Sequence, residues 1–257
     1  MTHTCTEPPA GGSKPTIRLF CFAHAGGGAT SFRAWQGRLG PQVTVCPVVL
    51  PGREKRWREP PYTSMDELVA GIMPQLRHRI GQPFALFGHS MGAAVAYELC
   101  RKFFPGPDGG PVHLLVSGRR APHTAARDRP AHRLPREDFL AYLHSLNGIP
   151  PEVAGHPQLL DAFLPTLRAD FQVNETYAPP RGPRLSVAVS AFLGADDPVV
   201  NVADMLCWRD ITAHEFRLRV FAGDHFYFKE RNPDLLAAIH HDLMAATAAW
   251  TPGKGGA

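Results

Sequence analysis

Short apolar runs alternate with helical patterns along most of the chain, and this alternation limits the possible fold more than any other feature. Each run is almost continuously apolar and is bounded by glycine or proline, as expected for strands buried on both faces of a parallel sheet. We expect strands at 17–22, 43–49, 84–87, 114–117, 187–193 and 216–221. The sequence therefore predicts an α/β protein whose mostly parallel sheet carries helices on both faces.

Three helices can be placed between these strands. The first has an apolar face from Met65 to Ile80, and Ser64 with Glu67 forms a capping box at its start. A second helix is expected at 90–104 and a third at 233–250, where Pro233 suits the first turn.

Residues 119–185 interrupt the alternation, because they hold no convincing strand. Two helical patterns lie within them; Asn147-Gly148 ends the first, and Pro165 should split or kink the second. An insertion of about 65 residues is too long for a plain connection, so we expect a helical lid over the sheet edge. Its apolar side chains could line an acyl channel, although a place in the helix core is the more ordinary role. These are Phe139, Leu143, Phe163 and Leu167.

The expected organisation is one core with an inserted lid. Residues 16–118 and 186–250 form the core and 119–185 form the lid, while 1–15 and 251–257 are expected to be loose tails because glycine, proline, threonine and lysine are frequent in them.

The most specific chemical signal is a G-x-S-x-G pentapeptide, Gly88 to Gly92, centred on Ser90. A serine on a sharp strand-to-helix turn needs glycine at the flanking positions. Chance would give this pentapeptide in roughly one of fifteen such chains, so it is moderate evidence alone. The apolar strand before it and the helical pattern after it favour Ser90 as a nucleophile over an idle serine in a glycine-rich turn.

A serine nucleophile needs a base and a carboxylate that orients the base. In a strand–turn–helix fold of this kind the chain order should be serine, acid, histidine. His225 follows the last expected strand and is the candidate base, with a purely structural histidine as the alternative. Asp196 and Asp197 follow the strand before it, and the sequence hardly decides between them. We favour Asp197, because a residue before proline is held extended.

A glycine run, Gly26 to Gly28, follows the first expected strand. An oxyanion formed during acyl transfer needs two N–H donors, and the expected donors are the backbone N–H groups of Met91 and Ala25. A phosphate-binding loop is the rival interpretation. It is disfavoured because no Gly-Lys-Ser/Thr follows and G-x-G-x-x-G is not met in frame.

Taken together, these motifs resemble the stand-alone type II thioesterases that accompany polyketide synthases and nonribosomal peptide synthetases. The matching stretches are 19–27 (LFCFAHAGG), 49–54 (VLPGRE), 87–94 (FGHSMGAA), 117–122 (SGRRAP), 164–177 (LPTLRADFQVNETY) and 216–227 (FRLRVFAGDHFY). The resemblance implies an α/β-hydrolase fold with a mobile helical lid. It also implies hydrolysis of stalled or wrong acyl groups from the phosphopantetheine arm of acyl or peptidyl carrier proteins. The nucleophile, acid and base roles carry over to Ser90, Asp197 and His225.

Two positions depart from the family pattern. Ala23 stands where the family usually has proline, and Asp224 stands where it usually has glycine. Asp224 places a second carboxylate next to the candidate base, which we expect to affect the pH dependence more than the activity itself.

Basic residues gather in two segments of a chain whose formal net charge is only +4, too little to indicate nucleic-acid binding. Residues 119–136 contain six arginines and one aspartate, and could steer an acidic carrier protein; a solvated loop is the alternative. The second segment contains Arg53, Lys55, Arg56 and Arg58 around Trp57.

Five scattered cysteines without a CxxC pair argue against a disulfide framework or a zinc site, so we expect reduced thiols in a cytoplasmic protein. No signal-peptide pattern or long apolar stretch is present, and we expect no cofactor, no metal, no membrane contact and a monomer. Two other functions stay open: a small-molecule carboxylesterase with the same triad, and a non-catalytic module that binds carrier proteins.

Overall fold

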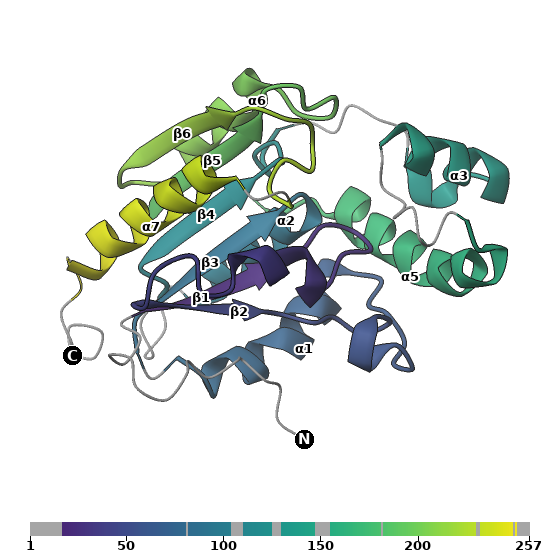
Figure 1. The fold of residues 1–257 in the computed structure, drawn as a ribbon, viewed down its shortest axis with the longest axis horizontal. Helices are drawn as coiled ribbons and strands as arrows, with labels where there is room; N and C mark the ends of the chain where they lie inside the picture. The colour runs from purple at the N-terminus through teal and green to yellow at the C-terminus, as the bar shows by residue number, and fades with distance from the viewer. Residues whose placement is uncertain are drawn as a thin grey trace.

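Six parallel strands form a single sheet in the order β2-β1-β3-β4-β5-β6 (Figure 1). The computed structural model describes residues 17–80, 82–103, 110–124, 130–146, 155–180, 182–229, 232–248 and 250. The strands are β1 Ile17–Phe22, β2 Val43–Pro47, β3 Phe84–His89, β4 His113–Ser117, β5 Ala188–Gly194 and β6 Phe216–Phe221. All six lie where the apolar runs predicted them, with ends shifted by one or two residues. The expected tails lie outside the described residues.

Helices cover both faces of the sheet (Figure 1). Helices α1 (Met65–Arg77) and α2 (Met91–Phe103) pack on one face, and α7 (Pro233–Ala248) and the 3-10 helix η1 (Ala29–Trp35) pack on the other. Alternate residues of each strand feed the two layers: Phe20 and Leu86 join one, and Leu19 and Phe87 join the other. Because both faces of the sheet are buried under helices, the architecture is the predicted α/β one.

The start of α1 shows how the local sequence sets an element. Ser64 Oγ accepts a hydrogen bond from the Glu67 N–H at 3.3 Å, as predicted. The carboxylate of Glu67, however, accepts from the N–H of Thr63 at 3.3 Å, so the reciprocal half of the box is displaced by one residue.

Helices α3 (Arg136–Ser145) and α5 (Pro157–Thr176) lie beyond the ends of the strands at the right of Figure 1. With η3 (Ala131–Arg133) they enclose a separate apolar cluster that includes Phe139 and Leu143. Helix α5 is continuous through Pro165, so of the two expected effects, a split or a kink, the split is wrong. A proline removes one N–H from the helix ladder, and the apolar packing along α5 outweighs that loss.

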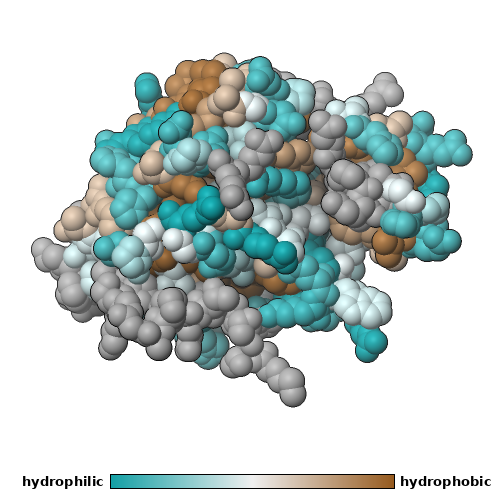
Figure 2. Space-filling model, viewed as in Figure 1, coloured by the Kyte–Doolittle hydropathy of each residue, from teal (hydrophilic) through white to brown (hydrophobic). Residues whose placement is uncertain are grey.

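Among the described residues five short helices were not predicted: η1, η3, η2 (Glu54–Arg56), α6 (Val202–Leu206) and η4 (Cys207–Ile211). A reciprocal capping box between Asn201 and Asp204 starts α6, and its sequence signal was overlooked. Figure 2 shows a mainly hydrophilic surface with an apolar patch over α6 and β6, where Val202, Leu206 and Val220 are exposed.

Cysteine usage and membrane contact can be partly judged from the described residues. Cys21, Cys100 and Cys207 are free thiols, whereas Cys46 is disulfide-bonded, so the expectation of reduced thiols throughout is wrong at that position. Within the part of the chain that the structure describes, no helix is long and apolar enough to span a bilayer.

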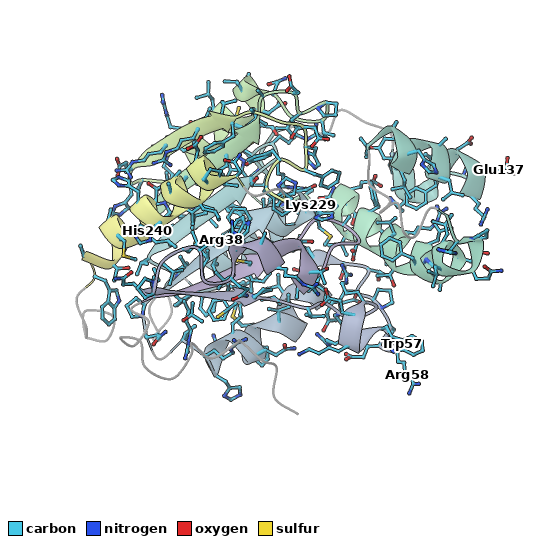
Figure 3. The ribbon with its side chains drawn as sticks, in the orientation of Figure 1. Arg38, Trp57, Arg58, Glu137, Lys229 and His240 are labelled. Atoms are coloured by element: carbon cyan, nitrogen blue, oxygen red, sulfur yellow. The ribbon has the colours of Figure 1, made fainter. Side chains whose placement is uncertain are left out.

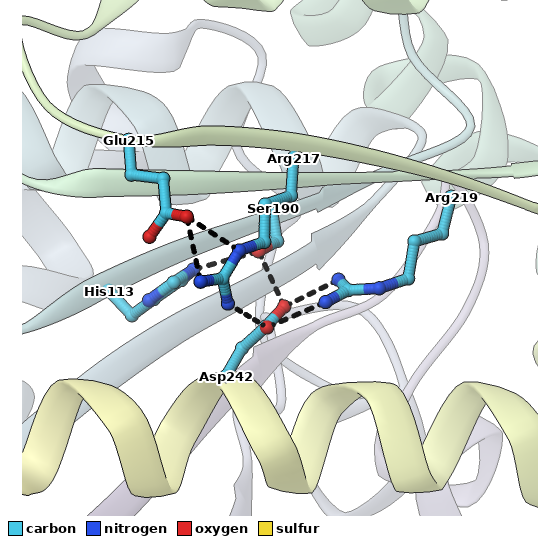
Figure 4. Close-up of polar contacts among 6 residues, drawn as sticks. All are labelled: His113, Ser190, Glu215, Arg217, Arg219 and Asp242. Atoms are coloured by element: carbon cyan, nitrogen blue, oxygen red, sulfur yellow. Dashed lines mark hydrogen bonds and ion pairs between the residues drawn. The ribbon is translucent and has the colours of Figure 1, made fainter.

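A buried polar network fastens α7 to the last three strands (Figure 4). Asp242 of α7 receives hydrogen bonds from Ser190 Oγ at 2.6 Å and from the guanidinium groups of Arg217 and Arg219 at 2.6 to 2.8 Å. Burial alone would raise the pKa of Asp242, but these hydrogen bonds outweigh it and lower the pKa to about 2. His113 Nε2 lies 2.9 Å from Ser190 Oγ, and burial lowers the pKa of His113 to about 4.

We expect His113 to make the fold sensitive to mild acid. Its pKa lies below that of an unfolded histidine, so the unfolded chain binds the extra proton as the pH falls from 6.5 toward 4, and the free energy of unfolding decreases. Between pH 7 and pH 5 the free energy of unfolding should therefore fall by about 2 kcal/mol more in the wild type than in His113→Gln. Urea unfolding at both pH values measures this difference. His78→Gln, at an exposed position, is the control. Equal pH dependence in the wild type and His113→Gln would contradict this account.

Candidate active site

Ser90 occupies a strained turn between β3 and α2. Its φ angle is +54°, a left-handed conformation that side chains rarely adopt. Glycine is required on either side: a Cβ at Gly88 would lie 2.0 Å from the carbonyl oxygen of Gly92, and one at Gly92 would lie 2.1 Å from that of Phe22. The pentapeptide therefore lets β1, β3 and α2 approach closely while Ser90 stands at the carboxyl end of the sheet.

His225 is paired with Asp197. Nδ1 of His225 lies 2.7 Å from Oδ2 of Asp197, whose side chain is fully buried. The other oxygen, Oδ1, accepts from the backbone N–H groups of Val199 and Val200 at 2.8 and 3.1 Å. The carboxylate is thus fixed from both sides. It favours the tautomer that carries the proton on Nδ1 and leaves a lone pair on Nε2.

Neither neighbouring aspartate competes for His225. Asp196 is exposed. The carboxylate of Asp224 accepts from the N–H of Phe226 at 2.7 Å, which closes a local turn. The sequence hardly decided between Asp196 and Asp197 but favoured Asp197, and the structure joins Asp197 to the histidine.

The end of β4 brings Ser90 and His225 to the same place. The Ser90 N–H donates to the carbonyl of Ser117 at 2.8 Å, and a Cβ on the next residue, Gly118, would lie 3.2 Å from Cε1 of His225. Among the described residues no hydrogen bond joins Ser90 Oγ to His225. A serine hydroxyl rotates freely, and such bonds often tighten only when substrate is bound.

The two expected oxyanion donors are free in the described part of the chain, since neither the Ala25 nor the Met91 N–H has an acceptor there. Residues 24–27 form a tight turn in which the Gly27 N–H donates to the His24 carbonyl at 2.9 Å. Gly26 has a φ angle of +75°, whereas Ala25 has no positive φ, which identifies a type II turn. We call residues 24–27 the oxyanion loop.

Two buried histidines, His24 and His89, lie beneath His225 and were not singled out from the sequence, although both stand inside its motifs. The ring of His89 lies 4.8 Å from that of His225 and 6.1 Å from that of His24. Burial lowers the pKa of both His24 and His89 well below the usual histidine value, so they are neutral at pH 7. Ser117 Oγ lies 2.9 Å from Nδ1 of His89 and 2.7 Å from the hydroxyl of Tyr227, which fixes the His89 ring.

Lys229 is a cation that contacts an aromatic ring beside these histidines. Its Nζ lies 3.9 Å from the ring centre of Phe226, and it lies near the middle of the view in Figure 3. Burial lowers the pKa of Lys229. In the described residues no group of three or more histidine, cysteine, aspartate or glutamate side chains could hold a metal ion.

A cavity of about 860 Å³ opens beside Ser90, between the end of β4 and the inserted helices. Tyr142 and Phe171 line it from the helices, together with Asn174. The four residues considered for an acyl channel do not line it and take the helix-core role that was the favoured alternative: Phe139, Leu143 and Leu167 are buried in the core of the insertion, and Phe163 packs against that core. Tyr142, which is next to Leu143, and Phe171, which is one helical turn after Leu167, face the cavity in their place.

In each of the two basic segments, some of the described arginines are bonded to acidic or polar side chains. In the segment 53–58, Arg53 is buried against Asp170 and Arg56 is bonded to Glu59, which leaves Lys55 and Arg58 exposed; Trp57 and Arg58 project outward at the lower right of Figure 3. In the segment 119–136, Arg127 and Arg129 lie outside the described residues. Arg119 hydrogen bonds to Asn174 on the cavity wall, and Arg136 is ion-paired with Asp161.

A second set of the same residue types, Ser190, His113 and Asp242, cannot act as a serine nucleophile system. Ser190 and Asp242 are completely buried between the sheet and α7 (Figure 4), and none of the three residues lines the cavity. The Ser190 hydroxyl also donates its proton to the carboxylate and not to the histidine. Residue identity alone therefore does not define the site.

The comparison with known protein families agrees with this geometry, because the model of the thioesterase domain matches residues 17–243. The chain belongs to the thioesterase family. The RedJ thioesterase of the prodiginine pathway in Streptomyces coelicolor superposes with a TM-score of 0.82 at 36% identity, covering 93% of this chain and 92% of that one. YbtT, the type II thioesterase of the yersiniabactin NRPS/PKS pathway, gives a TM-score of 0.82 at 30% identity, covering 95% and 98%.

A curated relative is the linear gramicidin dehydrogenase LgrE of Brevibacillus parabrevis, 39% identical over 232 residues that cover 89% of this thioesterase and 88% of LgrE. The name of LgrE contains the word dehydrogenase. In this chain the glycine run at 26–28 lacks the G-x-G-x-x-G fingerprint of a dinucleotide-binding site. The predicted α/β-hydrolase fold and the resemblance to type II thioesterases of polyketide and nonribosomal peptide systems are confirmed. This thioesterase is a hydrolase of the type II class.

The strain at Ser90 should be measurable as stability. Ser90→Ala keeps a Cβ at a positive φ angle, whereas Ser90→Gly removes it, so the glycine variant should unfold with a free energy about 1 kcal/mol higher than the alanine variant. Urea unfolding of the two inactive variants gives the comparison. A glycine variant less stable than the alanine variant would show that the turn is not strained.

Proposed function

We propose that the thioesterase removes acyl groups from the phosphopantetheine arm of carrier proteins by a serine acyl-enzyme mechanism. The observation that carries the proposal is the Asp197–His225 pair beside the strained Ser90, at the mouth of a cavity lined by the inserted helices. The roles proposed are nucleophile for Ser90, base for His225 and orienting acid for Asp197.

In the first half of the reaction, Ser90 Oγ attacks the thioester carbonyl while Nε2 of His225 takes the hydroxyl proton. The carbonyl oxygen becomes an oxyanion that the N–H groups of Ala25 and Met91 stabilise, and each such donor lowers the barrier by about 3 kcal/mol. Collapse breaks the carbon–sulfur bond, and His225 returns the proton to the departing thiolate. Ser90 is left as an acyl ester.

In the second half, water attacks the ester and His225 accepts its proton. The second oxyanion uses the same two donors, and its collapse returns the proton to Ser90 Oγ and releases a carboxylic acid. Asp197 orients His225 and stabilises the imidazolium that forms twice in the cycle.

The proposed partner is an acyl or peptidyl carrier protein. Support comes from YbtT, which belongs to the yersiniabactin NRPS/PKS pathway, and from the cavity, whose wall carries Arg119, Arg120 and Arg184. Burial lowers the pKa of Arg119 to about 10, which still leaves it charged at pH 7. Cations around the mouth would attract an acidic carrier. The inserted helices are proposed to act as a lid, because they cover this mouth.

Replacing the orienting acid should separate the two adjacent aspartates. Asp197→Asn should lower kcat by about 10⁴-fold with little effect on folding, because an amide favours the wrong tautomer of His225. Asp196→Asn, at the exposed neighbouring position, is the matched control and should keep wild-type kcat. The assignment fails if Asp196→Asn is the damaging change.

Substrate class can be tested with one acyl group presented on a holo carrier protein, on coenzyme A and as a nitrophenyl ester. We expect the largest kcat/KM for the carrier-bound form and no turnover of any form by Ser90→Ala. Equal or higher rates on the free ester would indicate a general carboxylesterase. Hydrolysis by Ser90→Ala would exclude the serine mechanism.

A further inference from the structure

We propose that Asp170 of helix α5, held by Arg53, positions the oxyanion loop and so couples the inserted helices to transition-state stabilisation. Both are positioning residues, and the inference rests on the proposed serine mechanism. Asp170 and Arg53 lie in two of the stretches that carry the family resemblance, but the sequence assigns neither of them a task.

The contact between α5 and the loop is a backbone one. Oδ2 of Asp170 accepts a hydrogen bond from the N–H of Gly26 at 2.7 Å, across 144 residues of sequence. The peptide that ends in this N–H begins at Ala25, the expected oxyanion donor. Asp170 therefore binds the residue next to the donor.

Arg53 completes the clamp by a two-pronged ion pair. Its two terminal nitrogens donate to the two carboxylate oxygens of Asp170, each at 2.7 Å. The same guanidinium donates to the carbonyl of Gly27 at 3.0 Å and to that of Pro51 at 3.3 Å. The loop is thus held at the N–H of Gly26 and at the carbonyl of Gly27, immediately after Ala25.

The turn type explains why a carboxylate is needed. Type I and type II turns differ by reversal of the central peptide, here the one joining Ala25 to Gly26. Reversal would direct the Ala25 carbonyl oxygen toward the side where Asp170 accepts the N–H of Gly26, and two negative oxygens would then oppose each other. Asp170 thereby selects the observed turn before substrate arrives, and such preorganisation makes a hydrogen-bond donor effective.

One face of α5 contacts both the oxyanion loop and the loop that contains Gly52 and Arg53. Phe163 and Leu167 crowd Gly26, where a Cβ would come within 2.8 Å of either side chain. Thr166 Oγ1 donates to the carbonyl of Gly52 at 3.0 Å. With Asp170, these residues follow the i, i+3, i+4, i+7 spacing of one helical face. A shift of α5 would therefore move the loop that carries the oxyanion donor.

Stability alone gives a poor reason for this ion pair. The side chains of Arg53 and Asp170 are 5% and 3% exposed, so both charges have lost most of their hydration. Apolar residues of similar volume often serve a fold as well as a buried ion pair, whereas removing one partner strands a charge. A paired replacement can therefore separate positioning from folding.

The central variant is Arg53→Met/Asp170→Leu, which removes both charges and should stay folded. We expect its kcat on a soluble acyl thioester to fall 10- to 100-fold with KM nearly unchanged, because a displaced donor is lost mainly in the transition state. Asp170→Asn should also lower kcat, because its amide NH2 group would face a hydrogen-bond donor, either Arg53 or the Gly26 N–H, where the carboxylate accepts from both. Asp161→Asn, on the exposed side of the same helix, is the control.

Two inhibitors supply a readout that a merely structural role would not move. When a trifluoromethyl ketone binds, Ser90 Oγ adds to the carbonyl of the inhibitor, the hydroxyl proton of Ser90 passes to His225, and an oxyanion forms. A non-hydrolysable thioether analogue binds without forming an oxyanion. We expect ketone affinity to fall by the same factor as kcat, and thioether affinity to stay within about twofold of wild type.

Wild-type kcat and ketone affinity in the folded double variant would overturn the inference, as would a parallel loss of affinity for both inhibitors. The proposed function is tested separately, since it fails if the ketone does not bind wild type or if Ser90→Ala hydrolyses the thioester.

Discussion

The left-handed backbone at Ser90 is the constraint on which the rest of the site depends. A side chain at this φ angle is held only if the surrounding backbone leaves no alternative, and the carbonyls of Phe22 and Gly92 supply that enclosure. The same close approach fixes β1, β3 and α2 relative to one another. Since the oxyanion loop leaves β1 and Met91 begins α2, the strained turn also sets the distance between the two expected oxyanion donors.

Most of the fold could be predicted because its signals are local. Buried parallel strands are almost continuously apolar, and each of the six is bounded by turn residues. The path of α5 through Pro165 could not be predicted, because it depends on packing against Phe139 and its neighbours, which lie far away in sequence. The short helix α6 carried a readable signal at Asn201 and Asp204 that was overlooked.

The candidate site shows the same division. Ser90 and His225 could be identified by their positions after predicted strands, since the carboxyl ends of parallel strands converge. Asp197 was favoured over Asp196 only through the proline that follows it, and the direction of the two side chains, which the structure gives, supports that preference much more strongly. The Asp170–Gly26 contact and the neutral state of His24 and His89 depend on burial by distant segments, so no motif announces them. The buried trio of Ser190, His113 and Asp242 shows the converse, that the right residue types can meet without a reactive hydroxyl.

Strand β6 ends the sheet, and an end strand offers unpaired backbone groups on which a foreign strand could assemble. Here that strand carries two arginines, Arg217 and Arg219, turned onto the face that α7 covers and anchored by Asp242. A strand added beyond β6 would meet this ionic layer on the side that α7 covers, whereas Phe216, Leu218 and Val220 alternate with the arginines and face the other side. The charged side chains between β6 and α7 therefore disfavour the addition of a strand from another molecule at this edge of the sheet.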